Sequence, residues 1–156
     1  MKSRVAAGAV AGVMAGVVFG IMMQMMSAPT PDGGQMPMMA MAAMVVGSSS
    51  VAVGWIYHLF NSAVIGAIFG WMVGNRATTV GRGLGWGALY GIVWWVIGAQ
   101  ILMPLALKMP PFASVMMPAM RMVAVGSLIG HIVYGSIVGA LLPVLAVQRA
   151  GRPLPS

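Results

Sequence analysis

Four long stretches of apolar residues dominate the pattern of hydrophobic and polar positions along the chain. They cover residues 5–28, 51–74, 83–107 and 122–147, and none contains Asp, Glu, Lys or Arg. A helix needs about 20 mainly apolar residues to cross the hydrocarbon core of a bilayer. We therefore predict an all-α integral membrane protein whose four transmembrane helices form one bundle.

Composition narrows the class of protein further. Hydrophobic residues occupy 60% of the 156 positions and charged residues only 6%, whereas a soluble domain carries about 25% charged residues. Such a chain cannot cover a water-facing surface with polar groups, which excludes a soluble enzyme and a disordered segment. The net charge of +7 comes from cations scattered between apolar stretches, without the basic stripe of a nucleic-acid-binding protein. The expected partner is the lipid bilayer, and no nucleic acid is expected.

The few charged residues predict an orientation in the membrane. With four spans, six cations lie on one side, and Asp32, Lys108 and Arg121 lie on the other. Lys and Arg are enriched in cytoplasmic loops. We therefore expect a multi-pass protein of a bacterial-type cytoplasmic membrane with both termini in the cytoplasm. The six cations are Lys2, Arg4, Arg76, Arg82, Arg149 and Arg152.

Glycines recur every four residues in the first and third apolar stretches, along one face of each predicted helix. Small residues on such a face let helices approach closely in a bilayer, an arrangement called a glycine zipper. Offsets of 71 and 73 residues relate the two halves of the chain. We predict two tandem, parallel helical-hairpin repeats, about 5–75 and 83–148, within a single membrane domain, 1–156. The matched positions are Gly12 with Gly83, Gly16 with Gly87, Gly20 with Gly91, His58 with His131, and Gly66 with Gly139.

Two shorter apolar segments, 36–47 and 109–120, connect the two spans of each repeat on the side opposite the termini. Each is too short to cross a bilayer. The sequence leaves open whether they lie at the membrane interface or re-enter the bilayer. The Pro- and Gly-rich segment 29–34, which precedes the first of them, is typical of a turn.

The two histidines of the chain are the first candidate site. His58 and His131 occupy matching positions in the two repeats, so we expect their imidazoles at equal depth on neighbouring parallel helices. Polar residues three or four positions from each histidine share its helix face, and polar groups in hydrocarbon are expected to face protein. Their simplest role is hydrogen bonding between helices. The polar lining expected in this half of the bundle comprises Gln24, Asn61, Ser62, Gln100, Ser127 and Tyr134.

A ligand held between the histidines is the sharper hypothesis. Two imidazoles at equal depth are suited to the axial positions of a haem b or another porphyrin-type pigment. Copper is the alternative cofactor, because the chain has 18 Met residues and thioethers favour Cu(I). The copper hypothesis uses His58 and His131 with Met36 and Met39. Room for a flat macrocycle is expected beside Gly54, Gly66, Gly70, Gly126, Gly130, Gly135 and Gly139.

Catalysis is not expected, because Asp32 is the single carboxylate side chain of the chain and lies in a Pro/Gly turn. Triads and carboxylate pairs both need an acidic group at the site. The expected function is a small accessory or structural subunit of a membrane complex, associated with copies of itself or with a larger assembly. The alternative is a channel or carrier for a small solute or ion, lined by the polar residues of the bundle.

Motifs within residues 55–147 suggest a family. They are the pattern Trp55-x-x-His58-x-x-x-Ser62-x-x-x-Gly66, the segment Met103-Pro104-Leu105 and the motif Gly130-His131-x-x-Tyr134. Together these motifs resemble the YagU-like group of small bacterial inner-membrane proteins. The resemblance implies a multi-pass protein of the bacterial inner membrane and assigns no activity. That group has an acidic residue a few positions before the Gly-His motif of the second repeat. In this chain the corresponding segment, 125–129, contains no charged residue.

Overall fold

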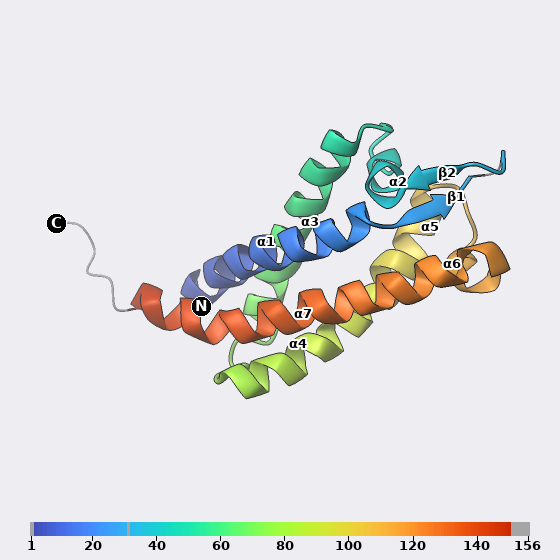
Figure 1. Ribbon diagram of the computed structural model, residues 1–156. Helices are drawn as coiled ribbons and strands as arrows, with labels where there is room; N and C mark the ends of the chain where they lie inside the picture. Colours follow the sequence, from blue (N-terminus) through green and yellow to red (C-terminus); the bar gives the residue numbers. More distant parts are fainter. Residues whose placement is uncertain (1, 31, 151–156) are drawn as a thin grey trace.

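The computed structural model describes residues 2–30 and 32–150, with side chains described to residue 147. The chain is mostly helical, and four of its helices are long and apolar enough to cross a membrane. They coincide with the four apolar stretches of the sequence, which confirms that part of the prediction (Figure 1). The four are α1 (Lys2–Gln24), α3 (Val51–Met72), a composite helix over Val80–Ala106, and α7 (Arg121–Ala150).

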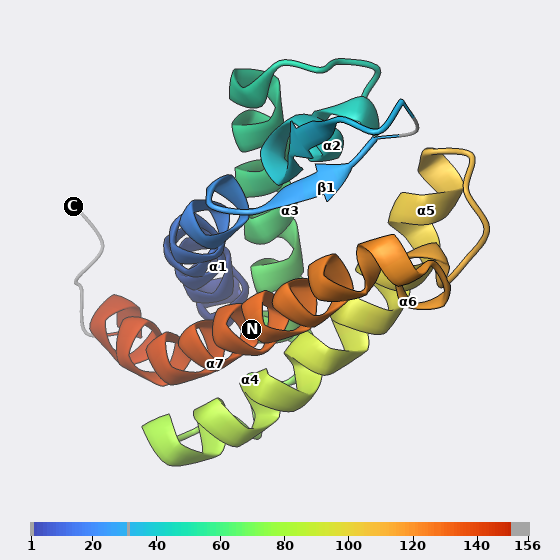
Figure 2. The same ribbon diagram turned by 45° about the vertical axis from the view of Figure 1, so that its right-hand side comes forward.

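The helices form two antiparallel pairs that share a central contact. α3 packs along α1, α4 (Val80–Trp94) packs along α7, and α1 and α7 pack against each other. α1 and α7 are therefore the inner helices, with α3 and α4 on either side (Figures 1 and 2). Figure 2 shows that α3 and the composite helix diverge toward the end of the molecule where α2 and α5 lie.

Glycines set the distance between the paired helices. A Cβ atom on Gly8 would overlap the carbonyl oxygen of Gly66, and one on Gly83 would overlap that of Gly139. A side chain at Gly8 or Gly83 would therefore force the two helices of its pair apart. Gly8 thus faces Gly66 as Gly83 faces Gly139, whereas the offset of 71 residues in the sequence matches Gly12 with Gly83.

A short β-hairpin replaces the simple turn expected after the first span, so the chain is not entirely α-helical. Strands β1 (Ser27–Pro29) and β2 (Gln35–Pro37) pair antiparallel. The turn between them is closed by a hydrogen bond from the Thr30 amide to the Gly34 carbonyl, at 3.0 Å. Gly33 adopts a φ of 85°, a conformation that side-chain-bearing residues rarely adopt. This hairpin is why α1 ends at Gln24, before the expected boundary at residue 28.

The connecting segments 36–47 and 109–120 fold differently from each other. The first contains α2 (Met38–Met44), which packs on α3 where the Met39 backbone lies against Gly54. The second contains one short α-helix, α6 (Ala113–Met116), and a single 3₁₀ turn, η2 (Pro118–Met120). The two halves of the chain therefore differ most at this end of the molecule.

The third long helix contains a π-helical segment that its hydrophobic pattern does not predict. The segment, η1 (Trp95–Leu102), joins α4 to the short α5 (Met103–Ala106). Pro104 has no amide hydrogen to donate to the Gln100 carbonyl. That carbonyl instead accepts a hydrogen bond from the Phe112 amide at 2.6 Å. The proline thus frees an acceptor that ties the following loop back onto the helix.

Candidate functional site

A cavity of about 430 Å³ lies where α3 diverges from η1 and α5. α1 and α7 contribute the opposite wall, and α2 lines the end nearest the β-hairpin. Val64 and Leu102 line the cavity and are 41% and 54% exposed, so it opens sideways between α3 and η1. No charged side chain is among its lining residues in the described part of the chain, and most of the wall is apolar.

Both histidines line this cavity, as the sequence suggests for a shared site. His58 Nε2 lies 2.9 Å from the Gly16 carbonyl oxygen on α1. His131 Nδ1 lies 2.8 Å from the Ser127 carbonyl oxygen, one turn earlier in α7. Carbonyl oxygens only accept hydrogen bonds, so each of these nitrogens carries the hydrogen. The two rings are therefore held in opposite tautomers when neutral.

The side chain of Phe19 lies against both imidazoles. Its ring centroid is 5.4 Å from that of His58 and 4.9 Å from that of His131, with edge-to-face geometry in both cases. Gly130 makes room for it, because a Cβ there would overlap the Phe19 ring. The sequence predicts the two imidazoles side by side, whereas in the structure both rings pack on one benzyl group. Sequence reasoning missed Phe19, since one aromatic residue in an apolar helix gives no signal.

This geometry bears on the haem hypothesis. The Nε2 atom of His58, one potential axial ligand, is already hydrogen-bonded to Gly16. The glycines expected to leave room for a macrocycle are instead covered by other parts of the chain: Met39 at Gly54, Gly8 at Gly66, Arg4 at Gly70, Met26 at Gly126, Phe19 at Gly130, Gly87 at Gly135 and Gly83 at Gly139. The residues present are therefore not arranged for a porphyrin between the histidines.

Four other predicted polar residues line the same cavity. Ser62 donates its hydroxyl hydrogen to the His58 carbonyl at 2.7 Å, and Tyr134 donates its own to the Ser62 carbonyl at 2.6 Å. The Ser127 hydroxyl lies 3.4 Å from His131 Nδ1. The Asn61 amide has no hydrogen-bond partner among the described residues and remains available to a ligand.

The two glutamines of the predicted lining lie elsewhere. Gln24 is exposed and accepts a hydrogen bond from the Trp55 indole at 3.3 Å. Gln100 is buried and accepts one from the Ser114 hydroxyl at 2.7 Å, beside a separate cavity of about 50 Å³. Gln24 and Gln100 therefore do not form a polar pair with each other or with the histidines.

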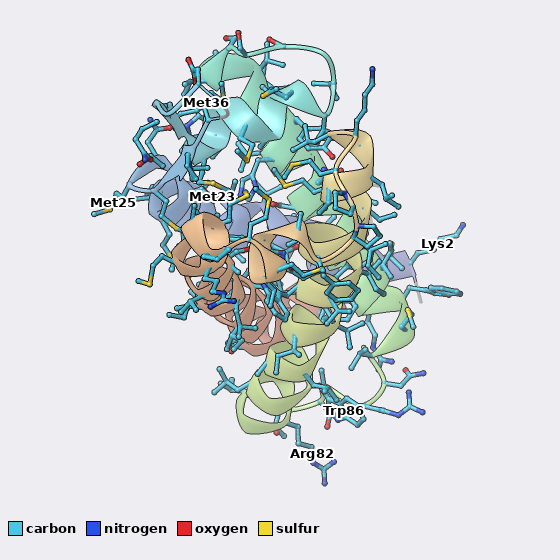
Figure 3. All side chains as sticks on the ribbon, turned by 90° about the vertical axis from the view of Figure 1, so that its right-hand side faces the viewer. Lys2, Met23, Met25, Met36, Arg82 and Trp86 are labelled. Atoms are coloured by element: carbon cyan, nitrogen blue, oxygen red, sulfur yellow. The ribbon has the colours of Figure 1, made fainter. Side chains whose placement is uncertain are left out.

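Methionines contribute to the main cavity, but not the two that the sequence singled out. Met36 is half-buried on β2 and Met39 is fully buried in α2, and neither is among the lining residues found in the described part of the chain. Met23 of α1 does line it, together with Met26, which follows that helix, and Met38. Figure 3 shows Met23 within the molecule. Within residues 2–30 and 32–150, no group of three or more His, Asp or Glu side chains is placed to hold a metal ion.

Chemically, the cavity joins an apolar wall to a few polar groups with unused hydrogen-bonding capacity. Those groups are the Asn61 amide, the Tyr57 hydroxyl and the second nitrogen of each imidazole. Apolar pockets with a small number of convergent polar groups are typical of sites for small molecules. No family model, curated protein or solved structure matches this chain.

Proposed function

We propose that this chain crosses a bacterial-type cytoplasmic membrane four times, with both termini in the cytoplasm. Large apolar side chains on the outer faces of the long helices support this, among them Ile21, Phe60 and Leu102, which are 53%, 66% and 54% exposed. An apolar surface of this extent suits contact with lipid better than contact with water. Within residues 2–30 and 32–150, the charged residues lie near the helix ends or in the connections between helices.

The proposed architecture is a pair of tandem helical hairpins. Its support is that the contacts between α1 and α3 recur between α4 and α7: Gly8 against Gly66 corresponds to Gly83 against Gly139. In the same way, Gly12 lies against the Ser62 carbonyl, and Gly87 lies against that of Gly135. Close approach of helices at small residues is the usual basis of packing in a bilayer.

The proposed function is to bind a small amphipathic molecule that enters the cavity from the bilayer. The observation that carries this proposal is the sideways-opening cavity of about 430 Å³, which has mostly apolar walls and includes Asn61 and His131 among its lining residues. Its volume lies within the range of about 300–1,000 Å³ that is typical of small-molecule sites. An opening between two lipid-facing helices admits a molecule with an apolar tail.

Binding is favoured over permeation because the other half of the molecule is filled. Phe69, Val138 and Leu142 are at most 1% exposed and lie toward the ends of α3 and α7 nearer the termini. A passage for a solute would need a polar, open path through this region. The proposed binding protein serves as an accessory subunit, alone or in a larger assembly, or as a carrier that releases its ligand elsewhere.

Filling the cavity tests the proposal. Gly98 lines it, and a Cβ at this position would make only an ordinary contact with Trp94 at 3.8 Å, so Gly98→Leu introduces a side chain into the cavity without displacing backbone. Gly85 lies in the same composite helix, and a Cβ there would meet no atom within 4 Å. Gly85→Leu is therefore the matched control.

The probe is a twelve-carbon alcohol that carries a diazirine in its chain, applied to protein in lipid nanodiscs. We expect saturable photolabelling of peptides from α3 and η1 in the wild type and in Gly85→Leu. In Gly98→Leu we expect the apparent affinity of the saturable labelling to fall at least about tenfold, which corresponds to about 1.4 kcal/mol. Labelling that does not saturate, or that is equal in Gly98→Leu, would overturn the proposal.

A further inference from the structure

The hydrogen bonds of the two histidines restrict which ligand head the cavity can accept. Each imidazole uses its N–H group on a backbone carbonyl, His58 on Gly16 and His131 on Ser127. In a neutral imidazole the second nitrogen is an acceptor. For His131 that atom is Nε2, which has no hydrogen-bond partner among the described residues. The side of the cavity formed by the imidazoles therefore offers acceptors.

Two hydroxyl groups of the wall already have partners: Ser62 and Tyr134 each donate their hydroxyl hydrogen to a backbone carbonyl of α3. Asn61 lines the cavity from the same helix as His58. Its amide has no hydrogen-bond partner among the described residues, so it offers both a donor and an acceptor. A ligand head that touches both His131 and Asn61 thus meets an acceptor on one side and a donor on the other.

We propose that the ligand carries a hydroxyl group as its polar head, an inference that rests on the proposed function and specifies its ligand class. A hydroxyl group donates one hydrogen bond and accepts others. It donates to His131 Nε2 and accepts from the Asn61 amide. A carbonyl or an ether only accepts, so it leaves the imidazole nitrogen without a partner. Leaving a buried polar group unpaired weakens binding.

The apolar wall supports an amphipathic molecule over a small polar alcohol. Phe19, Met23 and Ile65 line the cavity together with Trp94 and Leu102. The methionine side chain is flexible and adapts to tails of different shape. Two kinds of ligand share the required chemistry, a long-chain aliphatic alcohol and a phenol with an apolar tail.

Competition against the photolabel distinguishes head groups. The competitors are dodecanol, 4-octylphenol and the methyl ether of each. For at least one of the two pairs, we expect the hydroxyl compound to compete at least about tenfold better than its ether in the wild type, the effect of about one hydrogen bond. The pair with the larger ratio of hydroxyl to ether affinity shows whether the preferred head is an aliphatic alcohol or a phenol.

Variants assign the preference to the imidazole. In His131→Leu the ratio of hydroxyl to ether affinity is expected to fall to about one, whereas His131→Gln, which retains an acceptor, keeps part of it. If His131→Leu does not fold, His131→Phe, which keeps a flat ring but has no acceptor nitrogen, is expected to lower the ratio in the same way. Leu102→Ala, at the mouth of the cavity, is expected to weaken both members of a pair equally and leave the ratio unchanged.

The outcomes separate the two proposals. Saturable labelling that alcohols and ethers displace equally well would overturn the hydroxyl preference and leave the binding function in place. The same conclusion would follow if the His131→Leu and His131→Phe variants kept the wild-type ratio. An absence of saturable labelling in the wild type would instead overturn the proposed binding function, on which the hydroxyl preference rests.

Discussion

At the scale of single residues, the function of a glycine depends on what its missing side chain would touch. Gly83 and Gly85 are two positions apart in α4 and look alike in the sequence. A Cβ on Gly83 would overlap the Gly139 carbonyl of α7, whereas a Cβ on Gly85 meets no atom within 4 Å. One glycine therefore sets the helix separation, and the other occupies a free face of the helix.

The substitution Gly83→Ala tests this difference. We expect it to lower the stability of the protein by about 1–3 kcal/mol, because α4 and α7 must move apart to admit the methyl group. Gly85→Ala is expected to be neutral or to stabilise α4 by up to about 1 kcal/mol, because alanine favours the helix. Thermal unfolding in detergent, followed by circular dichroism, measures both. Equal effects of the two substitutions would show that the glycine contact does not set the packing.

At the scale of elements, long helices are predictable and short irregular segments are not. A stretch of 20 apolar residues gives the same signal whatever surrounds it, so the four long helices follow from the sequence. The strands Ser27–Pro29 and Gln35–Pro37 have three residues each, too few to show the alternation of a strand. In the π-helical segment before Pro104, the Gln100 carbonyl accepts a hydrogen bond from the Phe112 amide, a tertiary contact that hydrophobic periodicity does not report.

The hydrogen bonds of the β-hairpin turn predict that the stability of this turn depends on pH. The Thr30 side chain hydrogen-bonds to the Asp32 carboxylate, and with the amides of Asp32 and Gly34 it lowers the pKa of Asp32 below its ordinary value. A lowered pKa means that the ionised carboxylate stabilises the turn above the ordinary pKa of about 3.9. That contribution is lost as the pH falls through the lowered value.

The chemical shift of the Gly34 amide reports on this turn. We expect it to stay constant from neutral pH down to about 4 and to move toward its unstructured value at lower pH. Asp32→Asn removes the titrating group, so its Gly34 resonance is expected to show no such transition. A wild-type transition centred above the ordinary pKa of aspartate would contradict the hydrogen bonding described for this turn.

At the scale of the whole molecule, the candidate site was predicted in part. The repeat in the sequence predicts that His58 and His131 belong to one site, and both line the cavity. The cavity itself arises because α3 diverges from the composite helix, and the imidazoles pack on Phe19 of a third helix. Neither feature follows from the pattern of one helix, because each depends on how α1 and α7 pack at the centre.

The orientation in the membrane is open to a direct test, because the chain contains no cysteine. Single cysteines can therefore be placed at Thr78, between α3 and α4, and at Met116, which is 68% exposed at the opposite end of the molecule. In intact bacterial cells, a membrane-impermeant maleimide is expected to label Met116→Cys only. Thr78→Cys is expected to react only after the cells are permeabilised. The reverse pattern would invert the proposed orientation.

A third position tests insertion independently of orientation. Phe60 lies in the middle of α3 and is 66% exposed, so a cysteine there would react readily if this surface faced water. With α3 inserted as proposed, lipid around it would exclude both water and the maleimide, and would suppress ionisation of the thiol to the reactive thiolate. We therefore expect Phe60→Cys to remain unlabelled in intact and in permeabilised cells, and to react once denaturant removes the lipid. Rapid labelling in permeabilised cells would mean that this apolar surface does not face the bilayer.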